Sequence, residues 1–96
     1  MERVYFTYIT TTKNNRMFYV GVTSNLAGRI LQHKQKVTPG YTSQYNVTKL
    51  VYYEEFGDIY TAIAREKQLK NWHRQWKINL IKQNNPTFKE LACEWY

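Results

Sequence analysis

Cysteine is almost absent from this 96-residue sequence, which contains only Cys93, close to the C-terminus. A single cysteine forms no internal disulfide, which is typical of proteins from a reducing compartment, so we expect a cytoplasmic location. One cysteine and two histidines also fall short of the four ligands that a zinc finger needs. Cys93 lies beside Glu94 in the expected tail, a poor setting for a catalytic nucleophile.

Glycine and long apolar runs are scarce as well. The four glycines form neither a P-loop pattern nor a dinucleotide-binding pattern, and no serine occupies a nucleophile elbow. No apolar run approaches the roughly 20 residues that a membrane-spanning helix needs. The N-terminal residues MERVYF lead directly into an expected strand, so we expect neither a signal peptide nor a membrane partner.

Acidic residues are outnumbered, with 7 Asp and Glu against 14 Lys and Arg, which gives a formal net charge of +7. On a chain this short, such a charge favours polyanionic partners, and nucleic acid first among them. A basic surface that only keeps the protein soluble is the plainer alternative. Charge by itself favours nucleic acid by a modest margin.

Three segments have the composition of β-strands, at residues 4–10, 17–22 and 49–56. The first carries apolar side chains on both faces, which is typical of a central strand covered on both sides. The polar stretch that joins the first two strands contains Asn14 and Asn15, which favour a left-handed turn. We therefore expect these two strands to form a hairpin.

A first helix is expected after residues 23–25, the sequence Thr-Ser-Asn, because these residue types favour a helix cap. Its expected apolar face consists of Leu26, Ile30 and Leu31. Arg29 and His33 are four residues apart and therefore share one side of this helix. Together with Tyr19 of the preceding strand, they form a constellation suited to phosphate chemistry.

A second helix is expected over residues 59–71, with Asp58 as its cap. Its apolar stripe consists of Ile59, Ala62, Ile63 and Leu69. Glu66 falls inside this stripe, and an inward carboxylate is costly unless it is paired or bound to a metal. A structural ion pair, for example with Arg29, is the plainer interpretation of Glu66, and a metal ligand is the functional one.

The last third of the chain is expected to contain a third helix, within residues 72–84, and a tail. The helix carries Trp76, Leu80 and Ile81 at helical spacing, and we expect the tryptophans to lie in the core instead of stacking on bases. The sequence Asn84-Asn85-Pro86 ends it. Apolar residues of the tail, Phe88, Leu91 and Trp95, are expected to pack back as a short helix.

Residues 36–46 form an expected loop around the turn signal Pro39-Gly40. The loop is basic and carries tyrosine. Contact with a nucleic-acid backbone and an ordinary connection between elements are equally open interpretations of it.

These features together resemble the GIY-YIG nuclease superfamily. Tyr19-Val20-Gly21 stands at the second signature triplet, and Phe6-Thr7-Tyr8 stands at the first with only its tyrosine kept. Arg29, His33 and Glu66 fall at the catalytic arginine, at the position of a histidine or tyrosine, and at the metal-binding glutamate. The chain departs from some members at Val22, where they carry lysine. Others carry a late asparagine, and Lys77, Ile78 and Asn79 occupy that region here.

The resemblance implies an α/β (α+β) fold, with a three-stranded antiparallel sheet flanked by helices in the order ββαβαα. We place it in one domain over residues 1–96, with a core at 1–86 and a tail at 87–96. It implies a metal-dependent endonuclease that cuts phosphodiester bonds in nucleic acid, with DNA favoured over RNA and a role in DNA repair or recombination as one option. A nucleic-acid-binding module of the same fold without turnover is the main alternative, and a basic ribosome-associated or scaffold protein is a third.

The resemblance also assigns roles to individual residues. Glu66 would hold one Mg²⁺ or Mn²⁺ ion, and Arg29 would hold a phosphate oxygen. Tyr8 or Tyr19 would orient or deprotonate the attacking water, while His33 would take or relay the proton. Expected nucleic-acid contacts lie at Gly21, Lys34, Lys36, Tyr41, Lys70, Arg74 and Lys77. A protein partner or a homodimer is compatible with the sequence but is not indicated by it.

Overall fold

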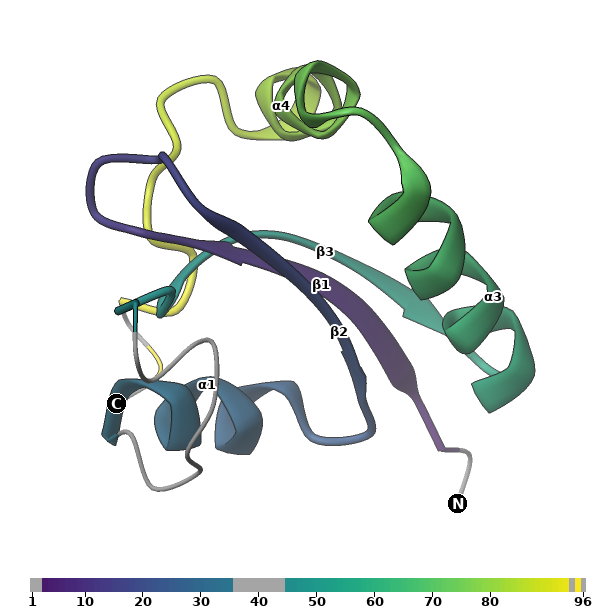
Figure 1. Ribbon diagram of the computed structural model, residues 1–96. Helices are drawn as coiled ribbons and strands as arrows, with labels where there is room; N and C mark the ends of the chain where they lie inside the picture. The colour runs from purple at the N-terminus through teal and green to yellow at the C-terminus, as the bar shows by residue number, and fades with distance from the viewer. Residues whose placement is uncertain (1–2, 36–44, 94, 96) are drawn as a thin grey trace.

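The structure is a computed structural model that describes residues 3–35, 45–93 and 95. Its elements are β1 (Tyr5–Thr11), β2 (Phe18–Thr23), α1 (Leu26–Gln35), β3 (Lys49–Phe56), α3 (Ile59–Asn71) and α4 (Arg74–Asn84). Figure 1 shows the three-stranded sheet with its helices in the order ββαβαα. The predicted fold class is therefore confirmed. No helix in the described part of the chain has both the length and the apolar character needed to cross a bilayer.

Strand β1 lies at the centre of the sheet, and both neighbours, β2 and β3, pair with it in antiparallel orientation. Its residues from Thr7 to Thr11 are all buried, as expected for a strand covered on both faces. At the β1–β2 turn, Asn15 has φ 60°, in the left-handed region that asparagine tolerates. The predicted hairpin is confirmed.

The helices divide between the two faces of the sheet (Figure 1). Because successive side chains of a strand point to opposite faces, Tyr8 and Ile9 enter different cores. The core that contains Tyr8 includes Leu26 and Ile30 of α1, together with Leu50 and Ala92. The core that contains Ile9 includes Val20, Val51, Tyr52, Leu69, Ile81 and Phe88.

The predicted helix starts are confirmed by their caps. Asn25 Oδ1 accepts a hydrogen bond from the Gly28 N–H at 3.1 Å, and Asp58 Oδ2 accepts one from the Thr61 N–H at 2.8 Å. A Cβ atom at Gly28 would lie 2.4 Å from Asn25 Nδ2, so the glycine makes room for the capping side chain. α1 therefore begins directly after its cap at Asn25.

The prediction for the apolar face of α1 is wrong at Leu31, which is 37% exposed. The third buried side chain of the helix is His33, at 8% exposure. Leu26, Ile30 and His33 follow a spacing of four and three residues, which keeps them on one face. Leu31 directly follows Ile30 and therefore points away from that face.

Two predictions for the C-terminal third are also wrong. Trp76 is 54% exposed instead of buried, because Ile81 is the buried residue of α4 and Trp76 packs edge-on against Trp72 and His73 at the surface. Residues 91–93 form a turn and not a short helix. The tail is held by the sheet instead, since the Leu91 N–H donates to the Leu50 carbonyl at 2.8 Å.

Candidate active site

Tyr8 occupies the centre of the candidate site. It lies on β1 directly opposite Gly21 of β2, and its side chain is fully buried. A Cβ atom at Gly21 would lie 2.5 Å from both Cζ and Oη of Tyr8, which is closer than real Cβ contacts. The close neighbour that Gly21 admits is thus the Tyr8 phenol, and the expected contact of this glycine with phosphate stays a prediction.

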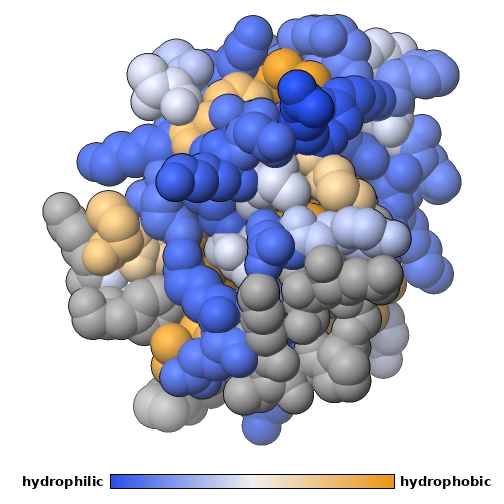
Figure 2. Space-filling view, turned by 60° about the vertical axis from the view of Figure 1, so that its left-hand side comes forward, coloured by the Kyte–Doolittle hydropathy of each residue, from blue (hydrophilic) through white to orange (hydrophobic). Residues whose placement is uncertain are grey.

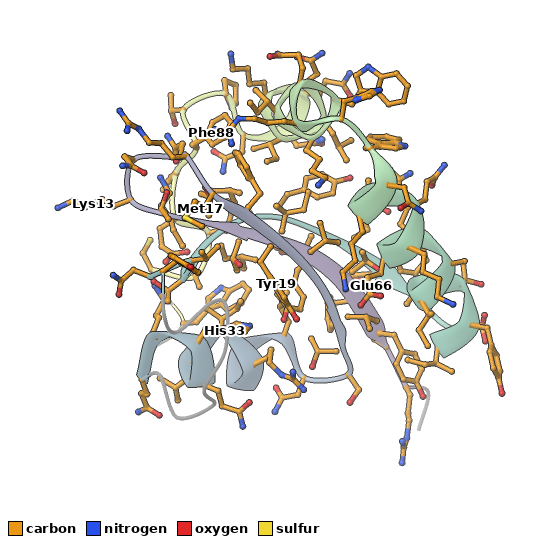
Figure 3. The ribbon with its side chains drawn as sticks, viewed as in Figure 1. Lys13, Met17, Tyr19, His33, Glu66 and Phe88 are labelled. Atoms are coloured by element: carbon orange, nitrogen blue, oxygen red, sulfur yellow. The ribbon has the colours of Figure 1, made fainter. Side chains whose placement is uncertain are left out.

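Three rings meet beside Gly21, from β1, β2 and α1. The ring centroids of Tyr8 and Tyr19 are 6.2 Å apart, those of Tyr8 and His33 are 6.0 Å apart, and those of Tyr19 and His33 are 5.8 Å apart. Tyr8 Oη and His33 Nε2 lie 3.0 Å apart, within hydrogen-bond distance. Figure 3 shows Tyr19 and His33 on the same side of the sheet, between β2 and α1.

Burial sets the protonation of Tyr8 and His33. It raises the pKa of the Tyr8 hydroxyl well above its ordinary value; Tyr19 and Glu66 raise it further, whereas the Arg29 charge acts in the opposite direction. Burial also lowers the pKa of His33, and the positive charge of Arg29 lowers it further. At neutral pH Tyr8 is therefore a neutral phenol and His33 a neutral imidazole.

Arg29 lies one helical turn after the Asn25 cap, and its N–H donates to the Asn25 carbonyl at 2.9 Å. The residue is exposed, while its charge acts on the pKa of both Tyr8 and His33. An exposed guanidinium next to two buried neutral groups is available to an anion that approaches the cluster.

Glu66 approaches the cluster from α3, on the other side of β2 (Figure 3). Its side chain is 17% exposed, and Oε1 lies 3.7 Å from Lys70 Nζ, one turn further along the helix. The expected inward position is thus a partly buried one. The ion-pair partner that the structure records is Lys70, whereas the example suggested by the sequence was Arg29.

Lys70 belongs to this site as well. Its Nζ atom lies 5.8 Å from the centroid of the Tyr19 ring, in addition to its contact with Glu66. The sequence predicted Lys70 as a nucleic-acid contact and did not connect it with the tyrosine. The spacing of four residues between Glu66 and Lys70 was the available signal for the ion pair of these two residues.

Three of the residues predicted as catalytic, Tyr8, Tyr19 and His33, are therefore in mutual contact. The charges of the other two, Arg29 and Glu66, act on the pKa of Tyr8. Among the described residues, no group of three or more His, Cys, Asp and Glu side chains is placed to hold a metal. Glu66 is the carboxylate of this cluster. A metal held here would take most of its ligands from water and substrate.

Three further predicted nucleic-acid contacts belong to the described residues: Lys34, Arg74 and Lys77. Lys34 forms an ion pair with Glu90, and burial lowers the pKa of Lys77. The Arg74 guanidinium donates to the Arg16 and Asn15 carbonyls. Lys36 and Tyr41 lie outside the described residues.

Residues 4–79 match the family model of the GIY-YIG catalytic domain. The chain belongs to the GIY-YIG family. This confirms the resemblance recognised in the two triplets and in the residues that follow them. Because the match extends from β1 into α4, it includes every residue predicted as catalytic.

Curated relatives of this GIY-YIG protein are named UPF0213 proteins. One from Staphylococcus haemolyticus is 33% identical over 79 residues, which cover 82% of this chain and 95% of the relative. Another, from Clostridium perfringens, is 36% identical over 76 residues, with coverage of 79% and 81%. The solution NMR structure of a UPF0213 protein from Bacillus halodurans has a TM-score of 0.57 at 21% identity, covering 95% of this chain and 97% of that one. That likeness shows the fold.

Proposed function

We propose that this GIY-YIG protein is a divalent-metal-dependent endonuclease that hydrolyses phosphodiester bonds in DNA. The convergence of a buried tyrosine–histidine pair, an exposed arginine and a glutamate carries the proposal. Hydrolysis of a phosphodiester needs an activated water, stabilisation of negative charge in the transition state, and assistance to the leaving oxygen. The first two of these needs have candidates among the side chains of the cluster, and a metal held by Glu66 would serve the third.

Tyr8 and His33 are suited to activate the water. Tyr8 is a neutral phenol, so it cannot act as a base without passing its own proton to another group. His33 is neutral, and its Nε2 atom lies 3.0 Å from Tyr8 Oη. As water gives a proton to Tyr8 Oη, the Tyr8 proton passes to His33 Nε2, and the hydroxide formed attacks phosphorus while the bond to the leaving oxygen breaks.

Arg29 is suited to stabilise the transition state. Its guanidinium is exposed, while its charge reaches both Tyr8 and His33. A rigid fork of N–H donors can hold a non-bridging phosphate oxygen as its negative charge grows. Tyr19, beside both rings, would orient the same phosphate or water.

Glu66 would hold one Mg²⁺ or Mn²⁺ ion. A single carboxylate fits these hard cations, because Mg²⁺ is commonly bound by one or two carboxylates and completes its shell with water and substrate phosphates. When bound, the ion supplies Lewis-acid stabilisation of charge on the phosphate oxygens. Lys70 contacts the carboxylate at 3.7 Å and would have to move or share it.

A nucleic-acid-binding module without turnover is the second candidate. The ion pair between Glu66 and Lys70 favours it, since it occupies the carboxylate that the metal would need. Val22, which stands where some members carry lysine, favours it as well. The fold and the basic charge serve both candidates equally.

Purified protein incubated with supercoiled, branched and single-stranded DNA separates these candidates. Each substrate is tested with Mg²⁺, with Mn²⁺ and with a chelator. The endonuclease proposal expects metal-dependent cutting of at least one substrate, which also ranks the substrates. If the protein binds these substrates and cuts none of them in either metal, the result supports the binding module. We propose cytoplasmic action on DNA in repair or recombination as the setting.

A further inference from the structure

Acidic residues are confined to a few parts of the sequence. No Asp or Glu occurs between Arg3 and Tyr53, and none occurs between Lys67 and Lys89. The β1–β2 hairpin, α1 and α4 therefore carry no carboxylate side chain. Positive charges in these elements are not neutralised by an acidic neighbour of their own element.

Lys70 is the first of a row of positive charges that leads away from the candidate active site. Its Nζ atom lies 5.8 Å from the Tyr19 ring and 3.7 Å from Glu66. Nearly half of its side chain, 48%, remains exposed. The charge is thus held beside β2 and is still accessible to an anion.

Arg74 continues this row four residues further along the chain, at the start of α4. Its guanidinium carbon lies 5.1 Å from the centroid of the Phe18 ring, next to Tyr19 on β2. The same guanidinium donates to the Arg16 carbonyl and, at 3.3 Å, to the Asn15 carbonyl. Arg74 therefore ties the start of α4 to the tip of the hairpin and fixes the position of the positive charges there.

The hairpin tip ends the row with Lys13 and Arg16, both exposed. The backbone between them is braced, because Thr12 Oγ1 accepts a hydrogen bond from the Arg16 N–H at 3.0 Å and donates one to Asn14 Oδ1 at 2.6 Å. Both residues line an open hollow of about 600 Å³ beside the tip. On this side of the molecule, hydrophilic side chains predominate among the described residues (Figure 2).

We propose that Lys70, Arg74, Arg16 and Lys13 form a track along β2 that holds the DNA backbone on one side of the cleavage site. We call this set the β2 track. This inference rests on the proposed function, because the track starts at the proposed cleavage site. It adds the hairpin tip as a binding surface that the sequence did not indicate. The row begins at the tyrosine and glutamate of the candidate site, so a strand bound there extends naturally along it.

The length of the β2 track suits a few nucleotides. Tyr19 and Arg16 are three residues apart, or about 10 Å along an extended chain. A DNA strand rises about 3.4 Å per nucleotide, so the hairpin tip lies roughly three nucleotides from the reacting phosphate. The side chains of the track are cations, which contact phosphates and read no sequence. We therefore expect binding through this track to be independent of sequence.

The test compares two double variants that remove the same charge. Lys13→Ala with Arg16→Ala removes the hairpin end of the track, and Lys67→Ala with Lys82→Ala removes two exposed lysines of α3 and α4 outside it. Binding of a fluorescein-labelled DNA duplex of about 20 base pairs is measured over a range of salt concentrations, with a chelator present so that no cleavage occurs. Each lost phosphate contact lowers the slope of log affinity against log salt by about 0.9.

The proposal expects the hairpin double variant to lose a slope of about 1.8 for two contacts, and to bind more weakly, while the control double variant changes much less. Equal losses in the two variants, or no binding by the unmodified protein, overturn it. A thermal melt checks that both variants fold. If the unmodified protein cuts DNA but both double variants lose binding equally, the track is rejected and the endonuclease is kept. If only the hairpin double variant loses binding and the unmodified protein cuts no DNA in any metal, the track is kept and the endonuclease is rejected.

Discussion

Tyr8 Oη lies 3.0 Å from His33 Nε2, although 25 residues separate the two in the sequence. Both side chains are buried, and the pKa of each is shifted in the direction that keeps it neutral. A neutral phenol beside a neutral imidazole can pass its proton to the imidazole while it takes one from water, which makes His33 the cation of the pair. This pair is the chemical centre of the proposed site.

The pH dependence of cleavage is expected to follow His33. The imidazole must be neutral to accept the Tyr8 proton, and burial with the Arg29 charge lowers its pKa below the ordinary value near 6.5. As the pH falls, cleavage should therefore decline with an apparent pKa below 6.5. A decline that is complete above pH 6.5 in the pH–rate profile contradicts a role for His33 as the base.

The stability of the fold should depend on the same group. The pKa of His33 is lower in the folded state than in the unfolded state, so the unfolded state binds the proton more readily below about pH 6.5. His33 therefore lowers the free energy of unfolding as the pH falls from about 6.5 toward its folded pKa. Urea unfolding across this range, compared with His33→Gln, measures the effect. An unchanged pH dependence in the variant rules out His33 as its source.

Gly21→Ala should disturb the site through Tyr8. The added methyl group would lie 2.5 Å from the buried phenol, so the ring or the strand must shift. We expect a loss of about 1–3 kcal/mol in the free energy of unfolding, together with slower cleavage. Gly57→Ala is the matched control, because its Cβ meets nothing within 4 Å. Similar melting temperatures for the two variants contradict the packing of Tyr8 against Gly21.

Arg29→Ala should reduce cleavage far more than binding. The arginine is one of 14 Lys and Arg residues, so its share of the total charge is small. A contact made to the transition state contributes about 3 kcal/mol or more to lowering the barrier, which is a rate effect of at least a hundredfold. Arg3→Ala, at another exposed position, is the control for lost charge. Cleavage at the unmodified rate makes Arg29 dispensable for the chemistry.

The parts of the fold that the sequence predicts well depend on local chemistry. Asn25 and Asp58 cap the helices that follow them, and Asn15 adopts the left-handed turn, because each effect is decided within a few residues. The burial of Leu31 and Trp76 was predicted wrongly, since helical spacing identifies a face but not the surface that the face will meet.

In the candidate site, too, the sequence predicts some features and not others. The positions of Tyr19 and Arg29 follow from short spacings along one strand and the next helix, which the sequence displays. The contact of Lys70 with Tyr19 and the clamp of Arg74 on the hairpin join segments more than 50 residues apart. Such contacts depend on how α3 and α4 pack beside β2, and no local pattern of residues encodes them.

In the proposed mechanism Glu66 holds the catalytic metal, and Glu66→Gln is the variant that tests this role. Gln keeps the shape of the side chain and removes its charge. The ion pair with Lys70 is an i,i+4 pair with a half-exposed lysine, so its loss should change the free energy of unfolding by about 0.5 kcal/mol or less. Glu55→Gln, at an exposed carboxylate of β3, controls for the change in net charge.

The decisive measurement is the rate of Mg²⁺- or Mn²⁺-dependent DNA cleavage by the Glu66→Gln and Glu55→Gln variants, with a thermal melt of each. We expect Glu66→Gln to fold like the unmodified protein, to bind DNA at least as well and to lose metal-dependent cleavage, while Glu55→Gln still cuts. A sharply lowered melting temperature of Glu66→Gln with residual cutting would contradict this expectation and make Glu66 a structural ion-pair partner.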